Sequence, residues 1–301
     1  MALEDHEIFA FVLEGAPDLW ADGYLYRLNE GHGVAFNAST GLAHALINNS
    51  DSDVRLFVMT EAFRRNSRAS HPRDEAANEH LAKAGMLWSD APKRKLGPND
   101  GKPGTQSGRK RGLPEFAAHW RDLLTRKPNR YPKSDEDQTL DARFDNRACF
   151  SRIGMRVQVL KPSRRTSWPH AERDEDEFIY VVSGQVDAWN DGWITPMGEG
   201  DFIGWRNGTG ITHVIINNGN EDALLIVGGE RSRFINQYWY PFHPQYNKEI
   251  GSAYWADHPV PKLGPHDGLP GTLRVRVPAQ FRRSAVSANE AARNLSKLRR
   301  G

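Results

Sequence analysis

Short apolar segments, several of them rich in aromatic and β-branched residues, recur along the chain and are separated by turn residues. Residues 177–182 are rich in aromatic and β-branched side chains, which favour β-strands, and Ser183-Gly184 closes the segment. Several short strands at such spacing predict a mainly all-β protein built as a barrel or a sandwich. Further strands are predicted at 202–203, 213–217 and 223–227, and hairpin turns at Asp22-Gly23 and Asp191-Gly192.

Helical patterns are few. The segment Leu113–Thr125 is predicted to form one helix, and Ser287–Leu298 a second helix near the C-terminus. In the second segment Ser287 stands at the N-cap position and Glu290 three residues later, which is the spacing of a capping box.

Composition narrows the class of protein. The 301 residues include 40 Lys and Arg against 38 Asp and Glu, a net charge of +2 that gives no strong attraction to nucleic acid or membranes. A single cysteine, Cys149, excludes an internal disulfide framework and a zinc site with several thiolates. Apolar runs stay well below the roughly 18 residues of a membrane span. The first residues are acidic, whereas a secretory signal begins with basic residues, so we expect a cytoplasmic protein. The basic run 109–111 is predicted to be a solvated loop.

The chain repeats itself at an offset of 169 residues without a gap, and the match holds through rare residue types. The aligned pairs include Gly15/Gly184, Asp18/Asp187, Trp20/Trp189, Gly31/Gly200, His44/His213 and Asn48/Asn217.

A Pro/Gly-rich block that follows each repeat also recurs, so that 88–105 matches 255–272. Because the same Trp and Asp appear in both blocks, we expect each block to be ordered and packed, with packing across to the other repeat as one arrangement. We predict an N-terminal module at 1–75, a connection with a short helix at 76–145, a second module at 146–245 and a tail at 246–301.

The second repeat resembles the cupin family. His170, Glu172, Glu177 and Gly184 follow the order of the first cupin motif, and residues 200–217, including His213, resemble the second motif. Two extra residues before His213, and an arginine at position 206 where proline is common, depart from the usual pattern. The resemblance implies a bicupin with two double-stranded β-helix barrels. Cupins commonly dimerise, so the resemblance also implies a homodimer as a possible assembly.

The resemblance also implies a metal site formed by His170, Glu172, Glu177 and His213. Residues i and i+2 of a strand face the same side, so His170 and Glu172 can both point into a barrel. Two imidazoles and two carboxylates suit one divalent first-row metal, namely Fe, Mn, Zn or Ni. The alternative is that residues 172–177 form a solvated acidic turn.

The first module is expected to hold no metal. In the ungapped alignment Met1, Leu3 and Ile8 stand in place of three of the ligands, and only His44 keeps its position. The module also starts without a strand equivalent to residues 153–160, so we expect either a truncated start with an exposed sheet edge, or completion by residues 273–277.

Five further residues are candidates for substrate contact: Arg156, Gln158, Trp168, Tyr180 and Trp205. An outward orientation for the first two, and a barrel-core role for the aromatic residues, remain open. The residues together predict a metal-dependent enzyme that acts on a small polar metabolite, without choosing between a dioxygenase, an isomerase and a lyase. The alternative is a non-catalytic ligand-binding or sensor protein whose metal is structural or absent.

Overall fold

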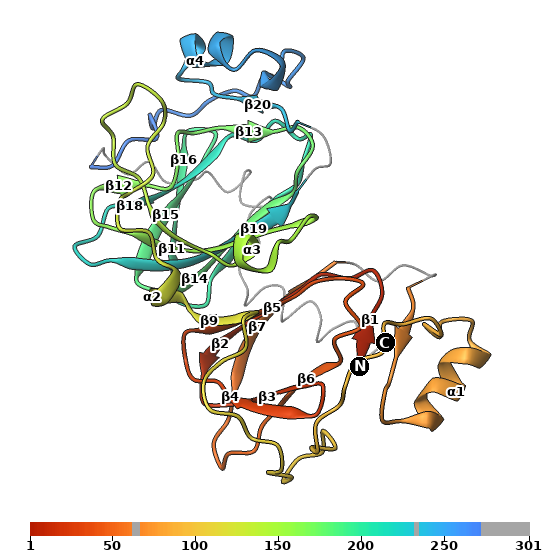
Figure 1. The fold of residues 1–301 in the computed structure, drawn as a ribbon. Coiled ribbons are helices and arrows are strands. Elements are labelled where there is room, and N and C mark those ends of the chain that lie inside the picture. The colour runs from red at the N-terminus through yellow and green to blue at the C-terminus, as the bar shows by residue number, and fades with distance from the viewer. Residues whose placement is uncertain (62–66, 232–234, 272–301) are drawn as a thin grey trace, which may run out of the picture. The chain divides into compact units, whose positions relative to one another are not determined.

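Each copy of the repeat folds into its own set of antiparallel strands in the computed structural model, which describes residues 1–61, 67–231 and 235–271 (Figure 1). The chain divides into two units. Unit 1 comprises Met1–Leu123 and Phe144–Ile153, and unit 2 comprises Leu124–Arg143 and the residues from Gly154 onward. The predicted connection 76–145 is therefore shared between the two units. The mainly β fold predicted from the sequence is confirmed.

Unit 1 contains a four-stranded sheet in the order β7-β2-β5-β9, a three-stranded sheet in the order β4-β3-β6, and the pair β1-β8. Apolar residues from both larger sheets, such as Val12, Leu19 and Val34, form one buried cluster. The strands are β1 (Ala2–Leu3), β2 (Ile8–Glu14), β3 (Asp18–Ala21), β4 (Tyr24–Arg27), β5 (His32–Phe36), β6 (His44–Ile47), β7 (Arg55–Thr60), β8 (Ala69–Ser70) and β9 (Ala117–His119).

Unit 2 contains a five-stranded sheet in the order β10-β11-β19-β14-β17, a four-stranded sheet in the order β12-β18-β15-β16, and the pair β13-β20. Buried side chains of both sheets, among them Val181, Ala188 and Ile215, pack into one core. The strands are β10 (Leu140–Arg143), β11 (Ile153–Leu160), β12 (Arg164–Arg165), β13 (Ala171–Glu172), β14 (Glu177–Ser183), β15 (Gln185–Asn190), β16 (Trp193–Gly198), β17 (Phe202–Trp205), β18 (His213–Asn217), β19 (Ala223–Glu230) and β20 (Tyr238–Trp239).

The helix predicted at Leu113–Thr125 is wrong. Residues 117–119 form β9, which pairs with β5, and only the four residues of α2 (Trp120–Leu123) are helical. Pairing with a sheet edge overrides the local preference of this alanine-containing segment. The terminal helix predicted at Ser287–Leu298 lies outside the described residues. The other helices are α1 (Glu75–Lys83), α3 (Phe144–Ala148), α4 (Pro244–Glu249) and the 3-10 helix η1 (Gly251–Ala253).

The described residues of each repeated Pro/Gly-rich block pack against the hairpin of their own unit. In unit 1 the Trp20 indole N–H donates to the Asn99 carbonyl at 3.2 Å, and in unit 2 Trp189 donates to His266 at 2.9 Å. In unit 2 the block also passes the hairpin turn so closely that a side chain at Gly192, whose φ is +86°, would overlap the backbone of Gly264. The described residues of these blocks are therefore ordered, and equivalent tryptophans attach them in both units.

Strand β7 lies at an edge of its sheet and has β2 as its only strand partner among the described residues. Its side chain Val58 is 55% exposed. The segment 273–277, expected as one means of completing this unit, lies outside the described residues.

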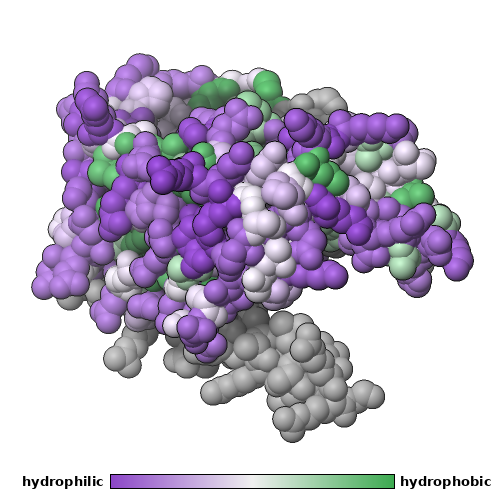
Figure 2. Space-filling view, turned by 60° about the horizontal axis from the view of Figure 1, so that its bottom comes forward, coloured by the Kyte–Doolittle hydropathy of each residue, from purple (hydrophilic) through white to green (hydrophobic). Residues whose placement is uncertain are grey.

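The surface in Figure 2 is mostly hydrophilic, with hydrophobic residues in small separate groups. Within the described part of the chain, no helix is long and apolar enough to cross a membrane.

Candidate metal centre

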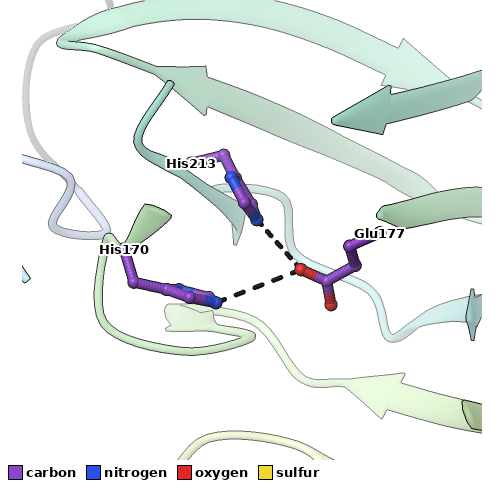
Figure 3. A group of neighbouring side chains, drawn as sticks. All are labelled: His170, Glu177 and His213. Atoms are coloured by element: carbon purple, nitrogen blue, oxygen red, sulfur yellow. Dashed lines mark hydrogen bonds and ion pairs between the residues drawn. The ribbon is translucent and has the colours of Figure 1, made fainter. Parts of the chain in front are cut away.

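Three side chains of unit 2 converge from separate elements (Figure 3). His170 directly precedes β13 and forms an antiparallel bridge with His213, the first residue of β18, while Glu177 begins β14. The bridge consists of two backbone hydrogen bonds, of 3.2 Å from the His170 N–H and 2.9 Å from the His213 N–H. It places the two imidazole rings side by side, with their centroids 4.9 Å apart.

The ligand atoms of these three residues lie within 4.8 Å of one another. The distance from Glu177 Oε2 is 2.9 Å to His213 Nε2 and 4.0 Å to His170 Nε2. Glu172, the fourth expected ligand, lies outside this group of three. Its Oε1 is 3.4 Å from His170 Nε2, and its Oε2 accepts a 3.0 Å hydrogen bond from the Asn236 amide.

The backbone fixes the orientation of both imidazole rings. His170 Nδ1 lies 2.9 Å from the Trp168 carbonyl oxygen, and His213 Nδ1 lies 3.2 Å from the Ile211 carbonyl oxygen. Since a carbonyl only accepts, each Nδ1 carries the proton, and each Nε2 faces Glu177 with its lone pair or a second proton. This is the arrangement that a metal-ligating histidine needs.

The charges of the site reinforce one another. Burial raises the pKa of Glu177, but the hydrogen bond and charge of His213, with smaller contributions from His170 and Arg156, lower it by more, so the pKa lies well below its usual range. Burial lowers the pKa of His170, and the neighbouring Glu172 and Glu177 outweigh this and raise it. The cluster thus holds an ionised carboxylate beside two imidazoles and attracts positive charge.

Trp205 supports the centre from behind. Its ring stacks on His213 with centroids 3.9 Å apart and an angle of 12° between the planes, and its indole N–H donates to Asn190 Oδ1 at 2.6 Å. The stacking restricts the His213 ring to the plane in which Nε2 meets Glu177.

The three residues lie in the wall of a cavity of about 420 Å³. Arg156 and Gln158 line it, which agrees with the inward orientation considered from the sequence. The remaining lining residues are mostly polar and are Thr125, Asn129, Arg130, Tyr131, Gln138, Asp141, Arg143, Thr166, Ser167, Glu172, Ile179, Val214, Val227, Tyr238 and Tyr240.

The three aromatic candidates do not line this cavity. Trp168 is buried, stacks on Tyr131 with centroids 4.0 Å apart, and donates its indole N–H to Glu136. Trp205 packs behind His213, and Tyr180 is separated by an odd number of positions from the cavity residues Glu177 and Ile179, so it faces the other side of β14. The structure therefore gives Trp168 and Trp205 packing contacts and places Tyr180 outside the cavity wall.

The alternative of a solvated acidic turn fits only part of the segment 172–177. Asp174 and Asp176 are exposed, whereas the side chains of Glu172 and Glu177 are only 12% and 16% exposed. The two expected ligands are therefore the carboxylates that turn inward.

Most of the cavity lining comes from residues that no sequence motif marks. Seven lining residues, from Thr125 to Arg143, belong to the segment 124–143, which lies outside both blocks of the repeat. The two tyrosines Tyr238 and Tyr240 belong to a segment with no recognised motif. The only available signal was the concentration of Arg, Asp and Tyr in a segment that the repeat does not explain.

Unit 1 has different residues at the equivalent positions. Ile8 begins β2 where Glu177 begins β14, and His44 begins β6 where His213 begins β18. The His44 ring stacks on Phe36 with centroids 3.7 Å apart, and burial lowers its pKa to about 4. His44 is therefore a neutral, packed histidine at pH 7.

Comparisons with known proteins agree with the repeated architecture. A model described as a cupin domain matches residues 2–60 and 156–228. No curated protein matches the chain. Among solved structures, the chain is similar to a putative sugar phosphate isomerase from Acidithiobacillus ferrooxidans (23% identity, TM-score 0.33), covering 34% of this chain and 65% of that one.

Two oxalate decarboxylases are also similar. The Bacillus subtilis protein, in a study of its Mn(II) centres, shares 15% identity over 78% of this chain and 66% of its own, with a TM-score of 0.45. The Lactobacillus farciminis protein, in a formate complex, shares 16% identity over 83% of this chain and 75% of its own, with a TM-score of 0.46. The chain thus spans just under two thirds of the first isomerase and of the B. subtilis protein.

Proposed function

Because residues 2–60 and 156–228 belong to the cupin domain family and make the chain a bicupin, we propose that unit 2 is a metal-dependent enzyme acting on a small polar metabolite. The observation that carries this proposal is the convergence of His170, Glu177 and His213 in the wall of a polar cavity.

The donor set fits a divalent first-row cation. Two imidazole Nε2 atoms and one ionised carboxylate are ligands that Fe, Mn, Zn and Ni accept, and the described site offers no thiolate. Both Nδ1 protons are engaged by carbonyls, so the Nε2 atoms are available as ligands. Glu172 would complete a four-residue set from the same cavity wall. When bound, the cation would polarise a substrate oxygen or activate water or dioxygen.

The residues around the ligands prepare the cavity for a polar molecule. Tyr131, Tyr238 and Tyr240 carry hydroxyl groups whose ordinary pKa of 10.0 keeps them protonated at neutral pH, and burial raises that pKa further. Their O–H groups can therefore donate hydrogen bonds to a ligand. Arg156 Nη2 lies 3.9 Å from Glu177 Oε1, so a fixed positive charge stands beside the ligand carboxylate. These groups would bind and orient a substrate while Trp205 keeps His213 in place.

The proposal is tested by titrating the metal-free chain with Mn²⁺ in a calorimeter. Replacing Glu177 or His213 with alanine is expected to abolish binding, while His44→Ala, which alters the equivalent position of unit 1, keeps it. Equal loss in His44→Ala would contradict the assignment to unit 2.

Catalysis is distinguished from ligand binding by incubating the metal-loaded chain with a mixture of small polar metabolites and following their ¹H NMR signals. If the chain is an enzyme, the signals of at least one metabolite are replaced by those of a product. The His213→Ala variant leaves all metabolite signals unchanged. A chain that binds a metabolite without converting any would be the non-catalytic alternative.

A further inference from the structure

The segment 124–143, here called the arm, precedes β11 in sequence and folds onto unit 2. We propose that the arm and β11 together form a subsite for the oxyanion group of a small hydroxylated ligand, a hydroxycarboxylate or a sugar phosphate. The inference deepens the proposed function by naming the substrate class, and its catalytic meaning rests on that function. The binding itself is testable without it.

Two arginines stand on neighbouring strands of the cavity wall. Arg143 of β10 and Arg156 of β11 are direct cross-strand partners, and both line the cavity. Arg156 also lies near the ligand carboxylate, with its Nη2 3.9 Å from Glu177 Oε1. Planar guanidinium groups bind carboxylate and phosphate oxygens in pairs, so two of them on neighbouring strands of one cavity wall suit an oxyanion.

Two buried side-chain amide groups in the cavity wall each leave one polar atom without a partner in the described part of the chain. Gln158 Nε2 donates to Asp141 Oδ1 at 3.1 Å, so Gln158 Oε1 is turned away from that carboxylate, and it has no hydrogen-bond partner among the described residues. Gln138 Nε2 is likewise without an acceptor there. Both residues line the cavity, and they are only 4% and 5% exposed. A buried acceptor and a buried donor that the protein leaves unmatched fit the hydroxyl groups of a ligand.

The charge of the cavity lining favours an anion once a metal is bound. Arg130 pairs with Asp137, and the other two lining arginines lie among three lining carboxylates, so a bound divalent cation makes this set net positive. The lining residues concerned are Arg130, Arg143, Arg156, Asp141, Glu172 and Glu177. Neutral polyols gain nothing from this field, whereas an oxyanion does.

The arm is held firmly enough to present a preformed subsite. Glu136 accepts hydrogen bonds of 2.6 and 2.8 Å from Arg165 of β12, and Asp137 accepts one of 3.0 Å from Arg164. Tyr131 stacks on the barrel residue Trp168. These contacts fix both ends of the arm's turn against unit 2, and the subsite needs little rearrangement to bind.

The test is isothermal titration of the full chain, metal-free and Mn²⁺-loaded, with matched probes. D-gluconate is compared with sorbitol, and glucose 6-phosphate with glucose, while hexanoate supplies an anion without hydroxyl groups. At least one anionic probe is expected to bind about tenfold more tightly than its neutral partner and than hexanoate, which is the size of one charge-assisted contact. The comparison of gluconate with glucose 6-phosphate distinguishes a carboxylate subsite from a phosphate subsite.

Two variants locate the binding. Arg143→Gln is expected to weaken the anionic probe about tenfold, while Arg147→Gln, an exposed arginine four residues away, leaves it unchanged. Gln158→Met should reduce the advantage of gluconate over hexanoate. Circular dichroism of each variant separates loss of binding from loss of folding.

The inference is overturned if no anionic probe exceeds its neutral partner, or if Arg143→Gln binds like the wild type. Metal content measured on the same samples keeps the two proposals apart. Retained oxyanion binding without metal uptake would refute the metal enzyme alone, and metal uptake without oxyanion preference would refute the subsite alone.

Discussion

The buried carboxylate of Asp18 in unit 1 offers the clearest stability prediction. Its side chain is 0% exposed and accepts hydrogen bonds from Arg27, Arg109 and Asn49 at distances between 2.8 and 3.2 Å. Asp18→Asn removes the charge and directs an N–H₂ group at one of these donors. The guanidinium groups keep 38% and 34% exposure, so water compensates part of the loss.

We therefore expect a cost of about 3 kcal/mol, the lower end of the range for breaking a buried ion pair. For a unit of this size, such a loss lowers the melting temperature by roughly 6–12 °C. Differential scanning calorimetry at pH 7.5 measures it. Asp51→Asn, at an exposed turn of the same unit, is the matched control and should change the stability by less than about 0.5 kcal/mol.

The pH dependence supplies an independent check. Burial raises the pKa of Asp18, but the hydrogen bonds of Arg109 and Asn49 and the charges of both arginines lower it below its ordinary value of 3.8. A folded-state pKa below the unfolded value stabilises the protein above the unfolded pKa, and this contribution is lost as the pH falls through the folded pKa. The difference between wild type and Asp18→Asn should shrink below about pH 4. A variant within 1 kcal/mol of wild type at pH 7.5 would refute the reasoning.

Two further predictions follow from close packing. Gly192→Ala places a methyl group against the Gly264 backbone at a φ of +86°, so urea unfolding should show a loss of about 2 kcal/mol or more, whereas Gly271→Ala, with open space around it, should lose less. Trp205→Leu removes the ring behind His213, and Mn²⁺ affinity should fall about 10–100-fold while the far-UV spectrum stays unchanged; an unchanged affinity would mean that the stacking does not position the ligand.

The sequence predicted those parts of the site that depend on local pattern. Glu177 and His213 stand at the starts of β14 and β18, and strand-forming residues predict both strands. The choice of these two residues as ligands came from the resemblance to the cupin motifs. The i and i+2 spacing of His170 and Glu172 likewise placed both in one cavity wall.

The remaining features depend on tertiary contacts that local pattern does not encode. Strand β9 forms because β5 offers an edge, which overrides the helix expected from 113–125. Arg143 meets Arg156 only because β10 pairs with β11. From the sequence, an aromatic residue near a metal-ligating residue can lie on either side of the sheet. Trp205 stacks on His213, whereas the sequence left open that it stacks on a bound substrate. The folded core decides which strands pair and which side of a sheet a side chain occupies.

The central claim is that unit 2 holds one metal ion between His170, Glu177 and His213. Elemental analysis of the chain purified without chelator tests it most directly. We expect about one equivalent of a first-row transition metal per chain, lost in His213→Ala and kept in His44→Ala. A wild-type chain without metal, even after anaerobic reconstitution with Fe²⁺ and Mn²⁺, would contradict the account.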